Sequence, residues 1–214
     1  MDKDIFLIGG IAIVCVAVVY FSFRLVFAYI YKVQNNFRLL AQKYQLEATI
    51  PTIGEWLFSN NYPTAVGNYE GSLLQLVTDS VPFGHQGKKM ETTVSMQLTT
   101  SVDFYFSICP EYAQKDPLAN TAQPIVAIND TTLPTYKITT TNKAAMQQLL
   151  GNSLIVKGLE ETTLLGSLYL DQKMLHYYMA NAITDESIRQ HIERVIGLMK
   201  MLVVEIEGHG NRTV

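Results

Sequence analysis

The chain has 214 residues, of which 48% are hydrophobic and 16% are charged, and its formal net charge is −3. This length allows one domain with its own core. Residues 1–46 carry five Lys/Arg and two Asp/Glu (+3), whereas residues 47–214 carry eleven and seventeen (−6). Because an acidic domain lacks the basic surface that nucleic acids require, we expect no nucleic-acid partner.

The segment from Ile5 to Phe23 (IFLIGGIAIVCVAVVYFSF) carries no charge. About 20 apolar residues suffice for a helix to cross the hydrocarbon core of a bilayer. A cleaved signal peptide would have a basic leader and a shorter apolar core, but the leader here is Met1-Asp2-Lys3-Asp4. A buried core helix would have a polar face, which this segment lacks. We therefore predict a retained transmembrane anchor over residues 1–31.

The basic residues around this segment predict its orientation. Lys3 precedes it, and Arg24, Lys32, Arg38 and Lys43 follow it. Because positive residues stay on the cytoplasmic side, we expect a single-pass protein of the inner membrane, with the N-terminus outside and the C-terminal domain in the cytoplasm.

Arg24 lies between two apolar runs and has two interpretations. Its guanidinium could extend to the lipid headgroups, with tyrosines in the interfacial belt, or it could pair with a partner subunit inside the membrane. Membrane lipid and membrane protein subunits are therefore the expected partners. The residues assigned to membrane or partner contact are Arg24, Phe27, Tyr29, Tyr31, Phe37 and Trp56.

Residues 32–62 are predicted to be a helical extension and a connector. One helix should run from Ile5 to about Leu46, because apolar residues recur at helical spacing beyond the anchor. The connector from Pro51 to Pro63 contains Trp56, which either packs on the domain or makes an interfacial contact. The predicted apolar face of the extension consists of Val33, Phe37, Leu40, Ala41 and Tyr44.

Residues 63–208 are predicted to form the α+β domain, followed by a tail at 209–214. A hairpin should turn at Glu70-Gly71. In Thr92–Cys109 almost every even position is apolar and the odd positions are polar, which predicts one long, half-buried antiparallel strand with a bend near Thr99-Thr100.

Further elements follow from turn residues, caps and periodicity. They are a loop at Pro110–Pro134 with a short strand at Ile125–Ile128, a strand at Tyr136–Thr140, a helix at Lys143–Leu150 capped by Asn142 and ended by Gly151, a short helix reaching Glu161, a hairpin of Leu164–Leu170 and Met174–Met179, and an amphipathic helix capped by Thr184 that ends near Glu207. The predicted fold class is α+β: a transmembrane helix, an antiparallel sheet packed by helices, and a long C-terminal amphipathic helix.

Three segments carry a resemblance to a known group: Phe37–Leu46 (FRLLAQKYQL), Gly67-Asn68-Tyr69-Glu70-Gly71, and the run from Leu164 to Ile206. With this order of elements, residues 37–206 resemble a loose group of uncharacterised bacterial single-pass membrane-anchored proteins. The resemblance implies the fold and the membrane association, and it implies no activity.

No phosphate-binding loop, nucleophile elbow, H-E-x-x-H or C-x-x-C motif occurs in the sequence. We therefore expect no catalytic, cofactor-binding or metal-binding residue and no cofactor. His191 is expected on a solvated helix face, and His176 and Cys109 are expected to be structural. Because Cys15 lies in the anchor, we expect no disulfide with Cys109, as in a reducing compartment.

Three functions are compatible with these features. The first is a non-catalytic accessory or scaffold subunit of a membrane complex. The second is a module that binds a small ligand or lipid in a pocket between the sheet and the last helix. The third is an enzyme whose residues come together from distant segments. The absence of any catalytic motif favours the first.

Overall fold

The computed structural model of the chain describes residues 2–82, 88–112, 118, 124–128 and 133–210. The described helices are α1 (Asp2–Tyr44), α2 (Ile53–Ser59), α3 (Lys143–Leu150), α4 (Ser153–Thr162) and α5 (Glu186–Gly210). The described strands are β1 (Glu47–Thr49), β2 (Thr64–Tyr69), β3 (Ser72–Pro82), β4 (Lys88–Gln97), β5 (Phe106–Pro110), β6 (Val126–Ile128), β7 (Tyr136–Thr140), β8 (Ser167–Asp171) and β9 (Met174–Met179).

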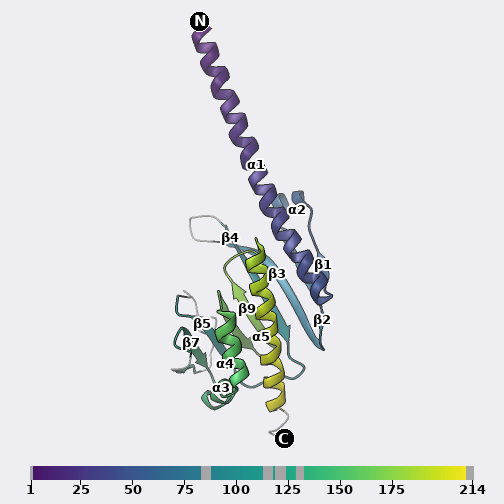
Figure 1. The fold of residues 1–214 in the computed structure, drawn as a ribbon, viewed down its shortest axis with the longest axis vertical. Helices are drawn as coiled ribbons and strands as arrows, with labels where there is room; N and C mark the ends of the chain where they lie inside the picture. The colour runs from purple at the N-terminus through teal and green to yellow at the C-terminus, as the bar shows by residue number, and fades with distance from the viewer. Residues whose placement is uncertain (1, 83–87, 113–117, 119–123, 129–132, 211–214) are drawn as a thin grey trace.

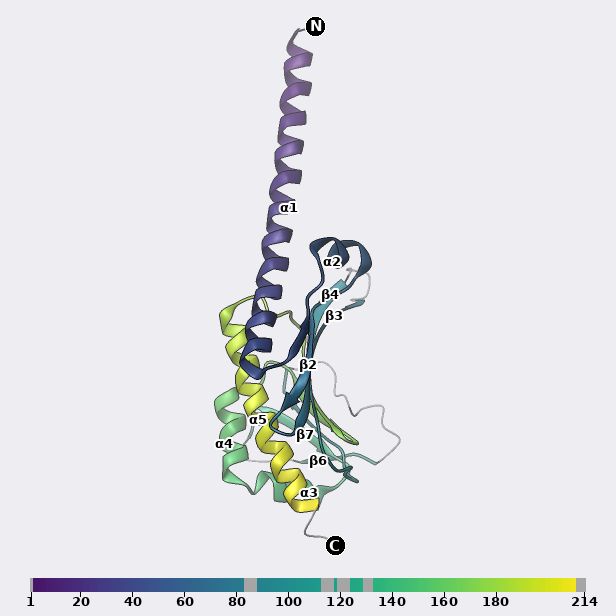
Figure 2. The same ribbon diagram turned by 90° about the vertical axis from the view of Figure 1, so that its right-hand side faces the viewer.

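The strands form one antiparallel sheet in the order β1-β2-β3-β4-β9-β8-β5-β7-β6. The helices α1, α4 and α5 lie on one face of this sheet, and most of α1 extends beyond the domain (Figures 1 and 2). The α+β class, the antiparallel sheet and the long C-terminal helix are confirmed.

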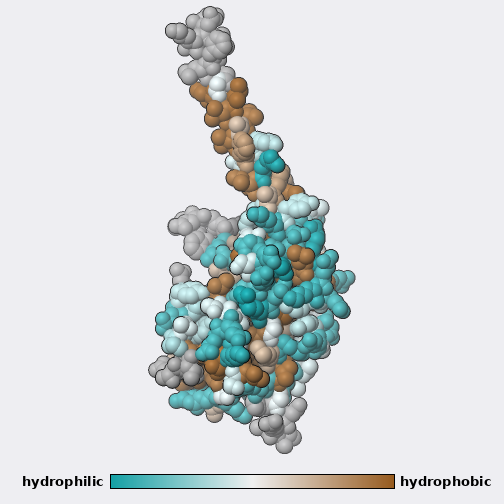
Figure 3. All heavy atoms as spheres, viewed as in Figure 1, coloured by the Kyte–Doolittle hydropathy of each residue, from teal (hydrophilic) through white to brown (hydrophobic). Residues whose placement is uncertain are grey.

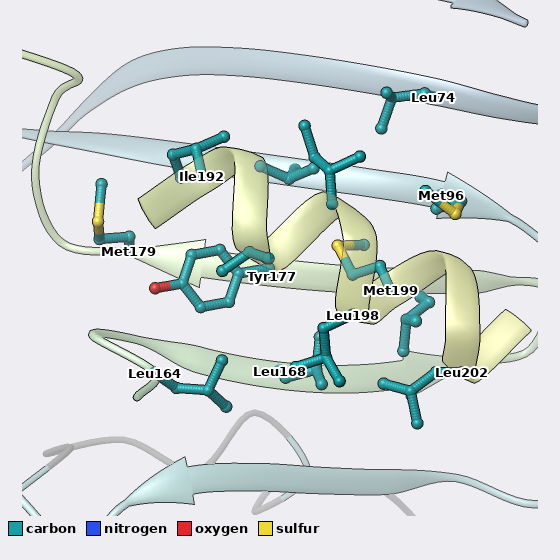
Figure 4. Close-up of a cluster of buried hydrophobic side chains, with 14 of the residues drawn as sticks. Leu74, Met96, Leu164, Leu168, Tyr177, Met179, Ile192, Leu198, Met199 and Leu202 are labelled. Carbon is teal, nitrogen blue, oxygen red and sulfur yellow. The ribbon is translucent and has the colours of Figure 1, made fainter. Parts of the chain in front are cut away.

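The core lies between the sheet and α5 (Figure 4). Alternate strand residues and one face of α5 meet there, as the two periodicities require. Met96, Leu168 and Tyr177 from the sheet contribute fully buried side chains, and so do Met199 and Leu202 from α5. The predicted apolar face of the last helix is therefore confirmed.

The long strand predicted over Thr92–Cys109 is wrong, because the chain divides it into β4 and β5. The hairpin of β8 and β9 lies between these two strands in the sheet. Both strands turn their even-numbered residues to the same core, so the alternation continues across the break. A period of two identifies the buried face of a strand but not its neighbour. The predicted bend at Thr99-Thr100 is where the chain leaves the sheet.

The start and the end of α5 also differ from the prediction. The carboxylate of Asp185, rather than the hydroxyl of Thr184, accepts the backbone N–H of Ile188 at 2.9 Å, so Asp185 provides the cap. The helix continues to Gly210 and passes the predicted end at Glu207.

Most of the other predicted elements are confirmed. The hairpin of β2 and β3 turns at Glu70 and Gly71, which have φ angles of 48° and 86°, as a tight hairpin turn requires. The strand β7 and the helix α3, capped by Asn142, have the predicted bounds. In the predicted loop at Pro110–Pro134, residues 113–117, 119–123 and 129–132 lie outside the described residues.

Gly166, just before β8, allows its backbone to pack directly against the backbone of β9, and a substitution tests this contact. A Cβ atom at this position would lie 1.9 Å from the carbonyl oxygen of Tyr178. Gly166→Ala should therefore lower the free energy of unfolding by about 3 kcal/mol. In the control Gly197→Ala, on the exposed face of α5, the new Cβ meets no atom within 4 Å, and stability should rise by about 1 kcal/mol through helix propensity. Denaturant unfolding followed by circular dichroism measures both; equal effects would contradict the assignment.

Candidate membrane anchor and its junction with the domain

The free part of α1 carries a mostly apolar surface (Figure 3). From Gly10 to Tyr29 no side chain is buried, and by length and composition the helix can cross a membrane. An isolated helix with apolar side chains on all sides is stable in lipid rather than in water, because lipid imposes no cost for exposing them. Among the residues that the structure describes, one helix is therefore compatible with a membrane anchor, as predicted.

Four of the six predicted contact residues lie on this free part of α1 or at its lower end. Arg24 is exposed, and the exposed fractions of Phe27, Tyr29 and Tyr31 are 39%, 38% and 64%. Aromatic and basic side chains at the end of an apolar span are typical of the membrane interface. Their contact with lipid or with a partner stays a prediction.

The other two residues, Phe37 and Trp56, do not form a contact surface. Phe37 is completely buried in the core and Trp56 is 7% exposed, with its ring edge-to-face against Tyr62 at 5.2 Å between centroids. Their assignment to membrane or partner contact is therefore wrong, and the alternative in which Trp56 packs on the domain is confirmed. An apolar stripe looks the same in sequence whether lipid, a partner or the chain's own domain covers it.

The helix α1 enters the domain without a break. Tyr29 is exposed, whereas the next residue, Ile30, is 1% exposed and begins a buried stripe. Burial of one large apolar side chain contributes about 1.5–3 kcal/mol, so the stripe attaches the second half of α1 firmly to the domain. The residues of the stripe are Ile30, Val33, Phe37, Leu40, Ala41 and Tyr44, and all belong to the main core.

Two buried amides fix the position of α1 along the domain. The side-chain nitrogen of Asn36 donates to the carbonyl oxygen of Ile183 at 2.9 Å, just before α5 begins. The side-chain nitrogen of Gln34 donates to the carbonyl oxygen of Pro51 at 2.7 Å, just before α2 begins. Buried polar groups are costly without a partner, so these bonds specify both the depth and the rotation of the helix.

A charged cluster joins the lower end of α1 to α5. The ammonium of Lys43 lies 2.6 Å from the carboxylate of Glu193, which also pairs with the guanidinium of Arg189. The hydroxyl of Tyr44 donates to the backbone carbonyl of Glu193 at 3.4 Å. Burial, with a further contribution from Glu193, raises the pKa of Tyr44, so its phenol stays protonated. Because this cluster is partly exposed, it adds less to the attachment of α1 than the apolar stripe does.

His191 is buried rather than solvated, which corrects the sequence interpretation. Its Nε2 lies 2.7 Å from the hydroxyl of Tyr177 in β9, and the residue is 3% exposed. Its pKa is lowered to about 4, mainly by burial and to a smaller extent by the positive charge of Arg194, while a backbone hydrogen bond at Thr162 opposes the shift. His191 precedes Val195 by four positions and therefore lies on the apolar face of the helix, so this spacing could have identified it as buried.

The other histidine and cysteine singled out from the sequence, His176 and Cys109, lie in strands β9 and β5 of the sheet. The His, Cys, Asp and Glu residues of the described part of the chain include no group of three or more that could hold a metal. His176 bonds Ser95 at 2.8 Å through Nδ1, as a structural histidine does, and the thiol of Cys109 is buried. A shallow cavity of about 230 Å³ is lined by Gly71, Leu73, Gln97, Leu98, Thr99 and Lys173, and Lys173 is its only ionisable side chain.

Comparison with known proteins yields a similarity of fold. No family model matches the sequence, and no curated protein matches it. The crystal structure of the mycobacterial trehalose monomycolate transport factor A, TtfA, is similar with a TM-score of 0.58 and 9% identity, covering 81% of this chain and 94% of that chain. At this identity the likeness concerns the fold alone. The predicted resemblance to a group of bacterial proteins is therefore supported at the level of the fold.

The buried amide of Asn36 allows a test of the junction with a matched control. Asn36→Ala leaves the carbonyl of Ile183 without its donor, and we expect the free energy of unfolding to fall by about 2 kcal/mol. Asn35 is exposed on the neighbouring position, and Asn35→Ala should change stability by less than about 0.5 kcal/mol. Thermal unfolding in detergent compares the two; indistinguishable losses would argue against the Asn36 contact.

The lowered pKa of His191 predicts a loss of stability in acid. Because the unfolded imidazole titrates near 6.5 and the folded one near 4, protons bind the unfolded chain first. The free energy of unfolding should therefore fall between about pH 6.5 and pH 4, by on the order of 3 kcal/mol. His191→Gln, which keeps a donor and an acceptor, should remove this part of the pH dependence.

The measurement is denaturant unfolding at several pH values between about 6.5 and 4. The pKa of His176 is also lowered by burial, so the difference between the wild type and His191→Gln, rather than the wild-type curve alone, isolates His191. Parallel curves for the two proteins would refute the assignment.

Proposed function

We propose that this protein is a non-catalytic accessory or scaffold subunit of a membrane protein complex. A single-pass anchor at the inner membrane, with the N-terminus outside, would hold the domain in the cytoplasm. The observation that carries the proposal is the unbroken passage of α1 from an exposed apolar surface into the core at Tyr29 and Ile30.

A rigid junction favours a subunit of an assembly over a domain that is only tethered. A tether needs only to retain the domain near the membrane, and a flexible linker does this. Here Asn36, Gln34 and Lys43 bond α1 to three other segments of the domain. The domain is therefore held at one distance and one rotation relative to the anchor, which is what a fixed position within a complex requires.

The fold similarity to TtfA gives limited support. That protein is named a transport factor, and an accessory role beside a membrane transporter would fit the present chain. The basic residues that follow the span, Arg24, Lys32 and Arg38, support the proposed orientation through the positive-inside tendency.

The ligand-binding alternative predicted a pocket between the sheet and the last helix. In the described part of the chain this space is filled by side chains such as Met96, Tyr177 and Met199, none of which is accessible (Figure 4). No observation favours this alternative or an enzymatic role over the accessory role.

Purification of the full chain from native membranes in mild detergent tests the proposal. We expect the same membrane protein to accompany it at a constant ratio. A Gly-Ser-Gly-Ser insertion between Ala28 and Tyr29 keeps the anchor and the domain but frees their relative orientation, and it should lower that ratio. The same insertion after Gly210 is the control. A wild-type chain that purifies alone would contradict the proposal.

A further inference from the structure

The helix α2 combines an exposed phenylalanine with a position beside the free part of α1. Phe58 is 85% exposed, the largest exposed fraction among the large hydrophobic side chains described. The helix α2 lies at the end of the domain from which the free part of α1 emerges (Figures 1 and 2). Phe58 is therefore exposed at the end of the domain that is nearest to the proposed anchor.

The side chain of Phe58 projects away from the domain. In a helix, two positions correspond to a rotation of about 200°, so Phe58 lies opposite Trp56. Trp56 packs into the domain against Tyr62. The capping box of Thr52 and Glu55 holds the first turn of α2, with the Thr52 N–H donating to the Glu55 carboxylate at 2.7 Å. Phe58 is thus presented on a fixed short helix rather than on a loose loop.

The length of α1 between the span and the domain places this end at the membrane surface. Arg24 is the first charge after the apolar segment, and Ile30 is the first buried residue. Six residues of helix rise about 9 Å, and the interfacial layer on each side of the hydrocarbon core is roughly 5–8 Å thick. The domain therefore begins where the headgroups end, and no linker separates the two.

From this geometry we infer that α2 is a second membrane contact, with the ring of Phe58 in the interfacial layer of the same leaflet as Arg24. The occupant of this surface is lipid, because α2 lies at the end of the domain from which α1 emerges, and α1 carries the exposed aromatic residues Phe27, Tyr29 and Tyr31 just before it enters the domain. Aromatic side chains favour this layer. Two contacts on two elements would fix the tilt of the domain on the bilayer. The inference rests on the proposed anchor.

Single-cysteine labelling of the full chain in vesicles of phosphatidylcholine tests it. A fluorescent dye is attached to the natural Cys15 in the span, to Phe58→Cys, or to Leu154→Cys, with Cys15→Ser in the last two. Cys15 is exposed, whereas Cys109 is buried and stays unlabelled. Leu154 is the matched control, because it is 65% exposed at the start of α4, next to α3 at the opposite end of the domain. The quenchers are brominated acyl chains in the lipid and iodide in the water.

We expect brominated lipid to quench the dye at positions 15 and 58 and to leave position 154 unchanged, and iodide to show the reverse order. Quenching by lipid at position 15 but not at position 58 would overturn the contact of α2 and leave the anchor intact. Absence of lipid quenching at position 15 would refute the anchor and, with it, the proposed function. Equal thermal unfolding of the three labelled proteins excludes misfolding as the cause of any difference.

Discussion

The structure depends on the packing of the second half of α1 against the domain. One face of this helix, from Ile30 to Tyr44, is part of the same core as the sheet and α5. The buried stripe makes the anchor a continuation of the core rather than an addition to it, so displacement of α1 would expose apolar surface on both sides. The extension predicted at 32–62 thus contributes to the core of the domain.

The polar contacts around this stripe fix the position of α1, which apolar packing alone would fix only loosely. Apolar packing tolerates small shifts along a helix, whereas a buried amide with one acceptor does not. Asn36 and Gln34 supply such bonds, and Glu193 holds two cations at the lower end. The orientation of the domain relative to the free part of α1 follows from these few contacts, and the proposed function rests on it.

The helix-covered face of the sheet is buried, whereas the end of the domain that carries α2 is exposed. The first is a closed core in which polar groups such as His191 and Tyr177 satisfy each other. The second carries Phe58 on α2, at the end of the domain from which α1 and its exposed aromatic residues emerge.

The sequence alone determined the long apolar N-terminal helix that is compatible with a membrane anchor, the period of each helix and the face that each strand buries, because these depend on local patterns of apolar residues. It predicted α3, β7 and the last hairpin for the same reason. Only the tertiary structure decided that β8 and β9 separate β4 from β5, that Phe37 and Trp56 are internal, and that His191 is buried. Those outcomes depend on which distant segments meet, and an apolar or alternating pattern records that a surface is covered without recording what covers it.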